Sequence, residues 1–206
     1  MKLKGLLLGG ALSAALFAAS GCGAQNTNTT GGTAPTGTNT APATASSNTT
    51  ATSQAAAPAI GHPAPSFDLP LLDGQGSVSL SSLLGKGKPI LLNAWASWCP
   101  PCQMETPDLV TMSKKYKGQM EFIGVDMTTQ ESNVQNAKAF VQKYNIPYTV
   151  LMDPKGTFMN AYALQGFPTT FILDPKGKIL NVEFGMMTKT QMQQVIEKAI
   201  ASSKAE

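Results

Sequence analysis

The residues best placed to do chemistry in this chain are two cysteines separated by two prolines. Cys99 and Cys102 flank Pro100 and Pro101, directly after the apolar run 89–96 and at the start of a helix-forming segment. A cysteine at the first turn of a helix faces unpaired N–H groups and the positive end of the helix dipole, and both stabilise a thiolate. A second cysteine one turn later can form a disulfide with the first. The spacing therefore predicts a redox-active pair.

The expected mechanism follows from that spacing. Reduced Cys99 attacks a partner disulfide, and Cys102, expected to be the more buried thiol, then attacks Cys99 and releases the reduced partner. The same steps in reverse oxidise a dithiol. Pro100 and Pro101 have no N–H groups to donate to the Cys99 sulfur, so we expect a couple in the reducing half of the known range, about −270 to about −120 mV. No cofactor beyond this disulfide is expected.

Two structural uses of the cysteine pair are poorly supported. A structural zinc site needs about four ligands, and the chain offers only His62 and Cys22 besides the pair, so no metal is expected. A purely structural disulfide would close a very short loop and constrain little of the chain.

An export signal is predicted over residues 1–21. A short basic head precedes an apolar run, 5–19, that is too short to span a membrane comfortably. Small residues then lead to Cys22, which resembles the lipobox of bacterial lipoproteins and implies lipid attachment there, with cleavage before it. A diacyl anchor holds a protein durably at a membrane. The alternative is an ordinary signal peptide that leaves Cys22 as a free thiol.

Residues 22–58 form a second region, of low complexity. After Cys22 it contains no charged and no aromatic residue, so it lacks the apolar surface needed to offset the entropy of ordering. We expect a disordered tether between the lipidated cysteine and a folded domain. Together with the signal, it predicts a location on the extracytoplasmic face of the bacterial cell membrane, where disulfides form.

The charge balance excludes one class of partner. The 15 basic residues are all lysine, and the formal net charge is +3. Without Lys2 and Lys4, which cleavage of the signal would remove, 13 lysines face 12 acidic residues. A balance so near neutral gives no reason to expect nucleic acid as a partner.

From residue 59 to 206 the pattern is that of one α/β domain. Short apolar segments alternate with segments at helical spacing, which indicates a sheet with helices on both faces. The ten methionines are expected to fill the core. The expected strands are 67–69 and 76–80 (a hairpin), 90–94, 121–126, 148–152, 169–173 and 179–184, and the expected helices are 81–85, 99–116, 134–144 (capped by Ser132), 158–164 and one capped by Thr188.

The segment 95–102, with Glu105 and Pro107, resembles the thioredoxin superfamily, and within it the membrane-anchored ResA/TlpA-type thiol-disulfide oxidoreductases. The likeness continues in the segments 61–67, 166–171 and 185–188. It implies a thioredoxin-like α/β fold, with a central mixed sheet, helices on both faces and an added N-terminal hairpin.

The resemblance assigns further residues to the site. It implies that Pro168 follows a cis peptide bond and packs against the disulfide, and that Phe167 offers backbone groups to an extended substrate segment. Trp98 and Pro100 are expected to contact substrate, whereas Trp95 is expected in the core. A trans Pro168 that simply begins a strand is the alternative.

One position departs from thioredoxin itself, which carries a buried Asp six residues before its first active-site cysteine. Asn93 stands there, and an amide cannot take a proton from Cys102. The resemblance implies that Glu105, three residues past Cys102, is the acid near the site, so we assign to it the tuning of the thiols and the shuttling of protons. The alternative is a solvated acid on the helix surface.

The resulting hypothesis is an extracytoplasmic, lipid-anchored thiol-disulfide oxidoreductase that acts as a monomer. The resemblance implies that it reduces disulfides in exported proteins, such as apocytochrome c, with electrons from a membrane thiol carrier. A thiol peroxidase is one alternative, but such sites use an Arg and a Thr, whereas this chain has no arginine and carries Ala96 three residues before Cys99. A copper-binding lipoprotein is the other, but copper carriers of similar fold use a wider cysteine spacing and a histidine, and the single His62 lies far upstream.

Overall fold

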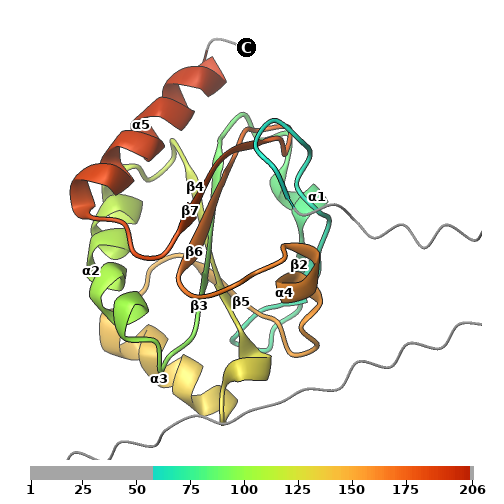
Figure 1. The fold of residues 1–206 in the computed structure, drawn as a ribbon, viewed down its shortest axis with the longest axis vertical. Helices are drawn as coiled ribbons and strands as arrows, with labels where there is room; N and C mark the ends of the chain where they lie inside the picture. The colour runs from blue at the N-terminus through green and yellow to red at the C-terminus, as the bar shows by residue number, and fades with distance from the viewer. Residues whose placement is uncertain (1–57, 205–206) are drawn as a thin grey trace, which may run out of the picture. The chain divides into compact units, whose positions relative to one another are not determined.

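The computed structural model describes residues 58–204. The predicted signal peptide, Cys22 and all but the last residue of the predicted tether lie outside this range. Within it, a mixed five-stranded sheet carries helices on both faces (Figure 1), which confirms the thioredoxin-like α/β fold. No helix in the described part of the chain is both long enough and apolar enough to cross a membrane.

Five strands form the central sheet. They are β3 (Ile90–Trp95), β4 (Glu121–Asp126), β5 (Thr149–Met152), β6 (Thr169–Leu173) and β7 (Ile179–Phe184). Their spatial order is β5-β4-β3-β6-β7. β4 runs parallel to β3 and β5, whereas β6 is antiparallel to β3 and β7. Every residue of β3 is buried, which explains why its sequence is apolar almost without alternation.

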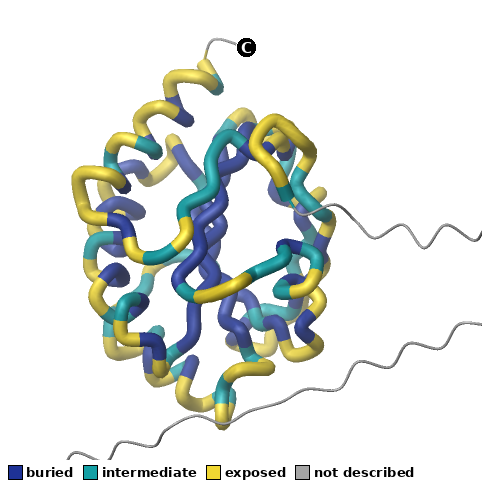
Figure 2. Tube along the Cα trace, in the orientation of Figure 1, coloured by how far each residue is buried: buried dark blue, intermediate teal, exposed yellow. Residues whose placement is uncertain are grey.

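Helices and a hairpin cover the two faces of the sheet. The helices are α1 (Leu80–Leu83), α2 (Pro100–Lys115), α3 (Val134–Tyr144), α4 (Thr157–Ala161) and α5 (Lys189–Lys204). Leu91 of β3 packs with Leu109 of α2 and Ile196 of α5 on one face. The other face carries α1, α4 and the predicted hairpin of β1 (Asp68–Pro70) and β2 (Ser77–Ser79). Figure 2 shows the burial concentrated along the strands between these two layers.

The start of α3 corrects one prediction. Ser132 was expected to cap this helix, but the cap is Asn133, whose Oδ1 accepts the N–H of Gln135 at 2.9 Å. Asn is as good a cap as Ser, and the helix itself spans Val134–Tyr144, as expected. The cap of α5 is confirmed, because Thr188 Oγ1 accepts the N–H of Gln191 at 3.3 Å and the Gln191 side chain accepts the N–H of Thr188 at 2.9 Å.

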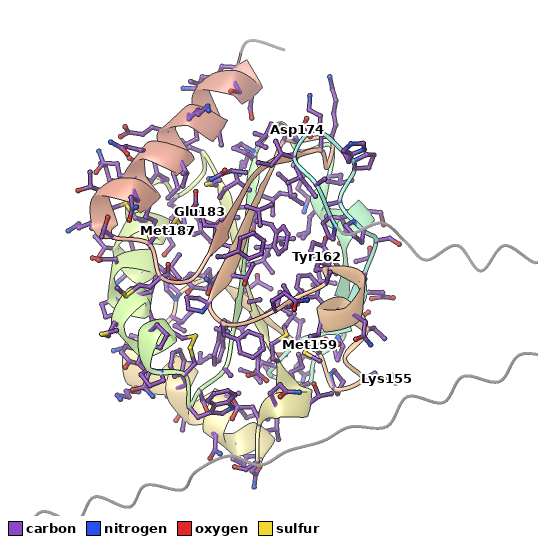
Figure 3. The ribbon with its side chains drawn as sticks, in the orientation of Figure 1. Lys155, Met159, Tyr162, Asp174, Glu183 and Met187 are labelled. Atoms are coloured by element: carbon purple, nitrogen blue, oxygen red, sulfur yellow. A yellow bond between two sulfur atoms is a disulfide. The ribbon has the colours of Figure 1, made fainter. Side chains whose placement is uncertain are left out.

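The short helix α4 ends earlier than expected. The pattern predicted 158–164, but the chain leaves the helix after Ala161, because Ala163 adopts a left-handed conformation with φ of +48°. Tyr162, labelled in Figure 3, packs the edge of its ring against Phe171 of β6 and donates its hydroxyl to the carbonyl of Pro65 at 2.8 Å. This contact fastens the segment before β1 to the sheet.

Candidate active site

The N-terminus of α2 positions the two cysteines. After β3 the chain makes one turn, in which the N–H of Cys99 bonds to the carbonyl of Ala96 at 3.2 Å. Cys99 is the N-cap of α2, and its Sγ accepts the N–H of Cys102 at 3.2 Å. Pro100 and Pro101 occupy the first helical positions, where an N–H would lack an intrahelical partner in any case.

A disulfide joins Cys99 to Cys102, with their Cα atoms 5.3 Å apart. The exposed fractions of the two side chains are 3% and 2%. The expected difference in burial between the two cysteines is therefore absent in the disulfide form.

The loop before β6 supplies the opposite wall of the site. The peptide bond between Phe167 and Pro168 is cis, which confirms the expectation for Pro168. The carbonyl oxygen of Phe167 lies 3.5 Å from Sγ of Cys99, and the Phe167 ring meets the ring of Trp98 edge-on with centroids 6.3 Å apart. The neighbouring residues Trp98 and Cys99 thus meet Phe167, which lies 68 residues after Cys99 in the sequence.

Glu105 is buried beneath this site, with 1% of its surface exposed. Its Oε1 accepts the N–H of Met187 at 2.9 Å and its Oε2 accepts the side-chain amide of Asn93 at 3.2 Å. The alternative of a solvated surface acid is therefore wrong. Glu105 belongs to α2. Figure 3 shows Met187 on the side of the sheet that carries α2 and α5.

The environment of Glu105 makes it a weak acid. Burial raises the pKa of Glu105 from 4.5 to about 7, because the charged form loses its hydration. The hydrogen bonds from Met187 and Asn93 lower this pKa, and the charge of Asp108 raises it slightly. A carboxyl group with a pKa near neutral can exchange protons with thiols at physiological pH.

Exposed apolar side chains occur on the segments that form the site. Trp98 is 54% exposed and Met104, two residues past Cys102, is 61% exposed. The segment between β7 and α5 reaches the same place, because the N–H of Gly185 bonds to the carbonyl of Pro168 at 2.8 Å. We call this surface the apolar rim, and its members are Trp98, Met104, Phe184 and Met186. The expectation that the methionines fill the core is thus wrong for two of them.

Known proteins resemble this chain over most of the described domain. The family model described as AhpC/TSA matches residues 60–182. The thioredoxin-like protein YneN of Bacillus subtilis is 39% identical over 66% of this chain and 78% of its own length. The thiol-disulfide oxidoreductase ResA of Halalkalibacterium halodurans is 33% identical over 66% of this chain and 75% of its own. The chain belongs to the AhpC/TSA family.

A solved structure shares its fold. The thioredoxin-family thiol:disulfide interchange protein of Chlorobium tepidum superposes with a TM-score of 0.60 at 31% identity, covering 70% of this chain and 99% of that protein. With the disulfide at the N-terminus of α2, these likenesses identify a thioredoxin-like thiol-disulfide oxidoreductase of the AhpC/TSA family.

The geometry adds residues that sequence reasoning missed. Glu131 accepts both the N–H and the hydroxyl of Ser97, the residue two positions before Cys99, and the carbonyl of Gln130 accepts the indole N–H of Trp98. The one available signal was position, since residues that follow the carboxyl end of a strand gather at the functional edge of an α/β sheet. Glu131 follows β4 in this way.

Metal ligands are scarce around the site. Within residues 58–204, no three His, Cys, Asp or Glu side chains are grouped so that they could hold a metal ion. A copper-binding role would therefore have to rest on the thiols of Cys99 and Cys102 alone.

Proposed function

We propose that this oxidoreductase reduces disulfides in exported proteins at the extracytoplasmic face of the bacterial membrane. The observation that carries the proposal is the setting of the Cys99–Cys102 disulfide within the apolar rim, against the backbone of Phe167. An exposed apolar surface of this kind suits a polypeptide. The carbonyl of Phe167 would then accept an N–H from an extended client segment, as in strand addition.

The proposed reaction transfers two electrons. The Cys99 thiolate attacks one sulfur of the client disulfide, forming a mixed disulfide and releasing a client thiolate. Cys102 loses its proton to Glu105 and attacks Cys99, so that the second client sulfur leaves as a thiolate and the Cys99–Cys102 disulfide forms. Trp98, Pro100 and the residues of the cis-proline loop serve as the contact surface for the client. An external dithiol then restores the reduced enzyme.

The direction of electron flow is inferred from the donors around Cys99. Among the described residues, one N–H donates to its Sγ, that of Cys102. Pro100 and Pro101 contribute none. Fewer donors stabilise the thiolate less, which raises the thiol pKa and makes the dithiol a stronger reductant.

The location and partners rest on the sequence. The lipobox-like end of the signal supports lipidation of Cys22 and a membrane anchor, and the low-complexity region supports a tether. Apocytochrome c is the proposed client class, a membrane thiol carrier the proposed electron donor, and the enzyme is proposed to act as a monomer. A Cys22→Ala variant should leave the membrane fraction, and a variant that stays membrane-bound would contradict lipid anchoring.

Mixed-disulfide trapping tests the function. A Cys102→Ser variant cannot complete the second step, so clients should accumulate as covalent adducts on Cys99, which mass spectrometry would name. A variant lacking both cysteines is the matched control. The absence of adducts would contradict a protein substrate, and fast turnover with hydrogen peroxide alone would favour the peroxidase instead.

A further inference from the structure

The turn that carries Trp98 is fastened to the loop after β4. Glu131 Oε1 accepts the N–H of Ser97 at 2.5 Å, and its Oε2 accepts the Ser97 hydroxyl at 2.7 Å. The preceding residue, Gln130, accepts the indole N–H of Trp98 with its carbonyl at 2.8 Å. Two consecutive residues of one loop thus hold two consecutive residues of the other.

These bonds matter because packing does little to fix Trp98. More than half of its surface, 54%, is exposed, and its contacts are the Gln130 carbonyl and the edge of the Phe167 ring. A side chain without a close-packed environment keeps one orientation only where specific hydrogen bonds select it. The Glu131 carboxylate accepts two hydrogen bonds from Ser97. Hydrogen bonds to a charged acceptor are stronger than neutral ones, so this pair holds the turn more firmly than the single bond to Trp98.

We propose that Glu131 is a positioning residue for client binding, which fixes the turn at Ser97 so that Trp98 stands beside Phe167 at the disulfide. The proposal rests on the proposed role of Trp98 and Phe167 as client contacts. Glu131 itself touches neither cysteine through any described hydrogen bond, so its effect on the reaction passes through the turn.

A second acidic residue, Asp126, interacts electrostatically with Glu131. It is fully buried at the end of β4, where Oδ2 accepts the Thr128 hydroxyl at 2.7 Å and Oδ1 has no hydrogen-bond partner among the described residues. The pKa of Asp126 is raised from 3.8 to about 7, mainly by burial and also by the negative charges of Glu131 and Asp153, while the hydrogen bond from Thr128 lowers it.

The test compares a protein disulfide with a small one. Second-order rate constants for reduction of insulin and of the small aromatic disulfide DTNB are measured for Glu131→Ala, Glu131→Gln, Ser97→Ala and Trp98→Ala. Glu131→Ala and Trp98→Ala should each slow insulin reduction about tenfold, the kinetic equivalent of one charge-assisted hydrogen bond. The DTNB rate should fall less than the insulin rate, and the reduction potential of Glu131→Ala should not change. Glu131→Gln and Ser97→Ala each keep one of the two hydrogen bonds. Their insulin reduction rates should lie between those of the wild type and Glu131→Ala.

Controls separate the possible failures. Glu121→Gln, at the opposite end of β4, is the matched acid-to-amide control and should leave both rates unchanged. If Trp98→Ala slows insulin reduction but Glu131→Ala does not, the positioning role is overturned while the proposed function stands. If Trp98→Ala has no effect, the client-contact role of Trp98 falls and the proposal with it. A shift in reduction potential, or equal losses with both substrates, in Glu131→Ala would also overturn the proposal.

A fluorescence measurement keeps the proposal testable if Glu131→Ala lowers stability. In a Trp95→Phe background the indole signal comes from Trp98 alone, since the chain has two tryptophans. The milder Ser97→Ala variant should then show added fast motion in the anisotropy decay of Trp98. An unchanged decay in both Ser97→Ala and Glu131→Gln would overturn the proposal.

Discussion

The side-chain amide of Asn93 donates a hydrogen bond to Oε2 of Glu105 at 3.2 Å, at the centre of the sheet and beneath the active-site helix. The same amide nitrogen also donates to the hydroxyl of Thr170 at 2.9 Å. Asn93 therefore holds the carboxylate in place and leaves the titratable role to Glu105. This relationship gives rise to the first three predictions.

Glu105→Gln should slow the second step of disulfide transfer. In the wild type the rate at which Cys102 resolves a mixed disulfide on Cys99 should rise with pH through about 7, as Glu105 becomes able to take a proton. The variant should lose that rise and be slower by about a hundredfold, the lower end of general-base effects. Stopped-flow resolution of a preformed adduct measures it. Asp108→Asn, on the same helix, is the control. If Glu105→Gln left both the resolution rate and the Cys99 titration unchanged, the role of Glu105 in proton transfer would be contradicted.

The pH dependence of stability should reveal the buried acids. Folding raises the pKa of Glu105 from 4.5 to about 7 and that of Asp126 from 3.8 to about 7. Between those limits the unfolded chain binds fewer protons than the folded one, so each group lowers the free energy of unfolding as pH rises, by up to about 1.4 kcal/mol per pH unit. Above about pH 7 the loss is complete.

Urea unfolding of the wild type and Glu105→Gln between pH 5 and 8 tests whether the free energy of unfolding falls with rising pH in this way. The variant should gain stability relative to the wild type as pH rises to about 7 and then keep a constant difference, because its amide does not titrate. A constant difference over the whole range would show that Glu105 titrates normally in the folded state.

Asn93→Asp should couple two carboxyl groups. A second carboxyl beside Glu105 cannot ionise at the same time without repulsion in a buried site, so the pair should hold one proton to a higher pH. The pH at which resolution by Cys102 accelerates should therefore move upward. Thr170→Val removes the other partner of residue 93 without adding charge and should move the profile less. Equal profiles for Asn93→Asp and the wild type would contradict the contact.

The apolar rim should matter for proteins and not for small disulfides. Met104→Ser should slow insulin reduction by about tenfold, the cost of losing one good apolar contact, and leave DTNB reduction unchanged. Ile60→Ser is a matched control, because Ile60 is 60% exposed and Met104 is 61% exposed, but Ile60 lies before β1 and outside the rim. Equal effects of the two substitutions on insulin reduction would remove the rim from the client surface.

The sequence predicted those parts of the site that are determined by residues close together in the chain. The cysteine spacing and the proline pair fix the start of α2, and the motif around Pro168 fixes the cis loop, so the sequence was sufficient for both. The burial of Glu105 could not be predicted from the sequence, because its hydrogen-bond partners Asn93 and Met187 are 12 and 82 residues away. Helical spacing places an acid on a face but does not say what covers that face.

The rim and the fastening of Ser97 were missed for a related reason. Met104 is apolar within a helix, a pattern that usually indicates core, and only the assembled fold shows that it is exposed on the active-site helix. Glu131 lies 34 residues from Ser97 in a polar loop, where an acid ordinarily faces solvent. In both cases the deciding fact is which distant segments the sheet order brings together.

The reduction potential of the Cys99–Cys102 couple tests the central claim most directly. The purified domain, residues 58–204, is equilibrated with glutathione buffers. The fraction of disulfide, measured by mass spectrometry after thiol labelling, gives the potential. A protein-disulfide reductase whose Cys99 sulfur accepts one N–H among the described residues should have a potential below about −180 mV, in the direction of about −270 mV. A value above about −180 mV would contradict the reductase account and indicate an oxidant or isomerase instead.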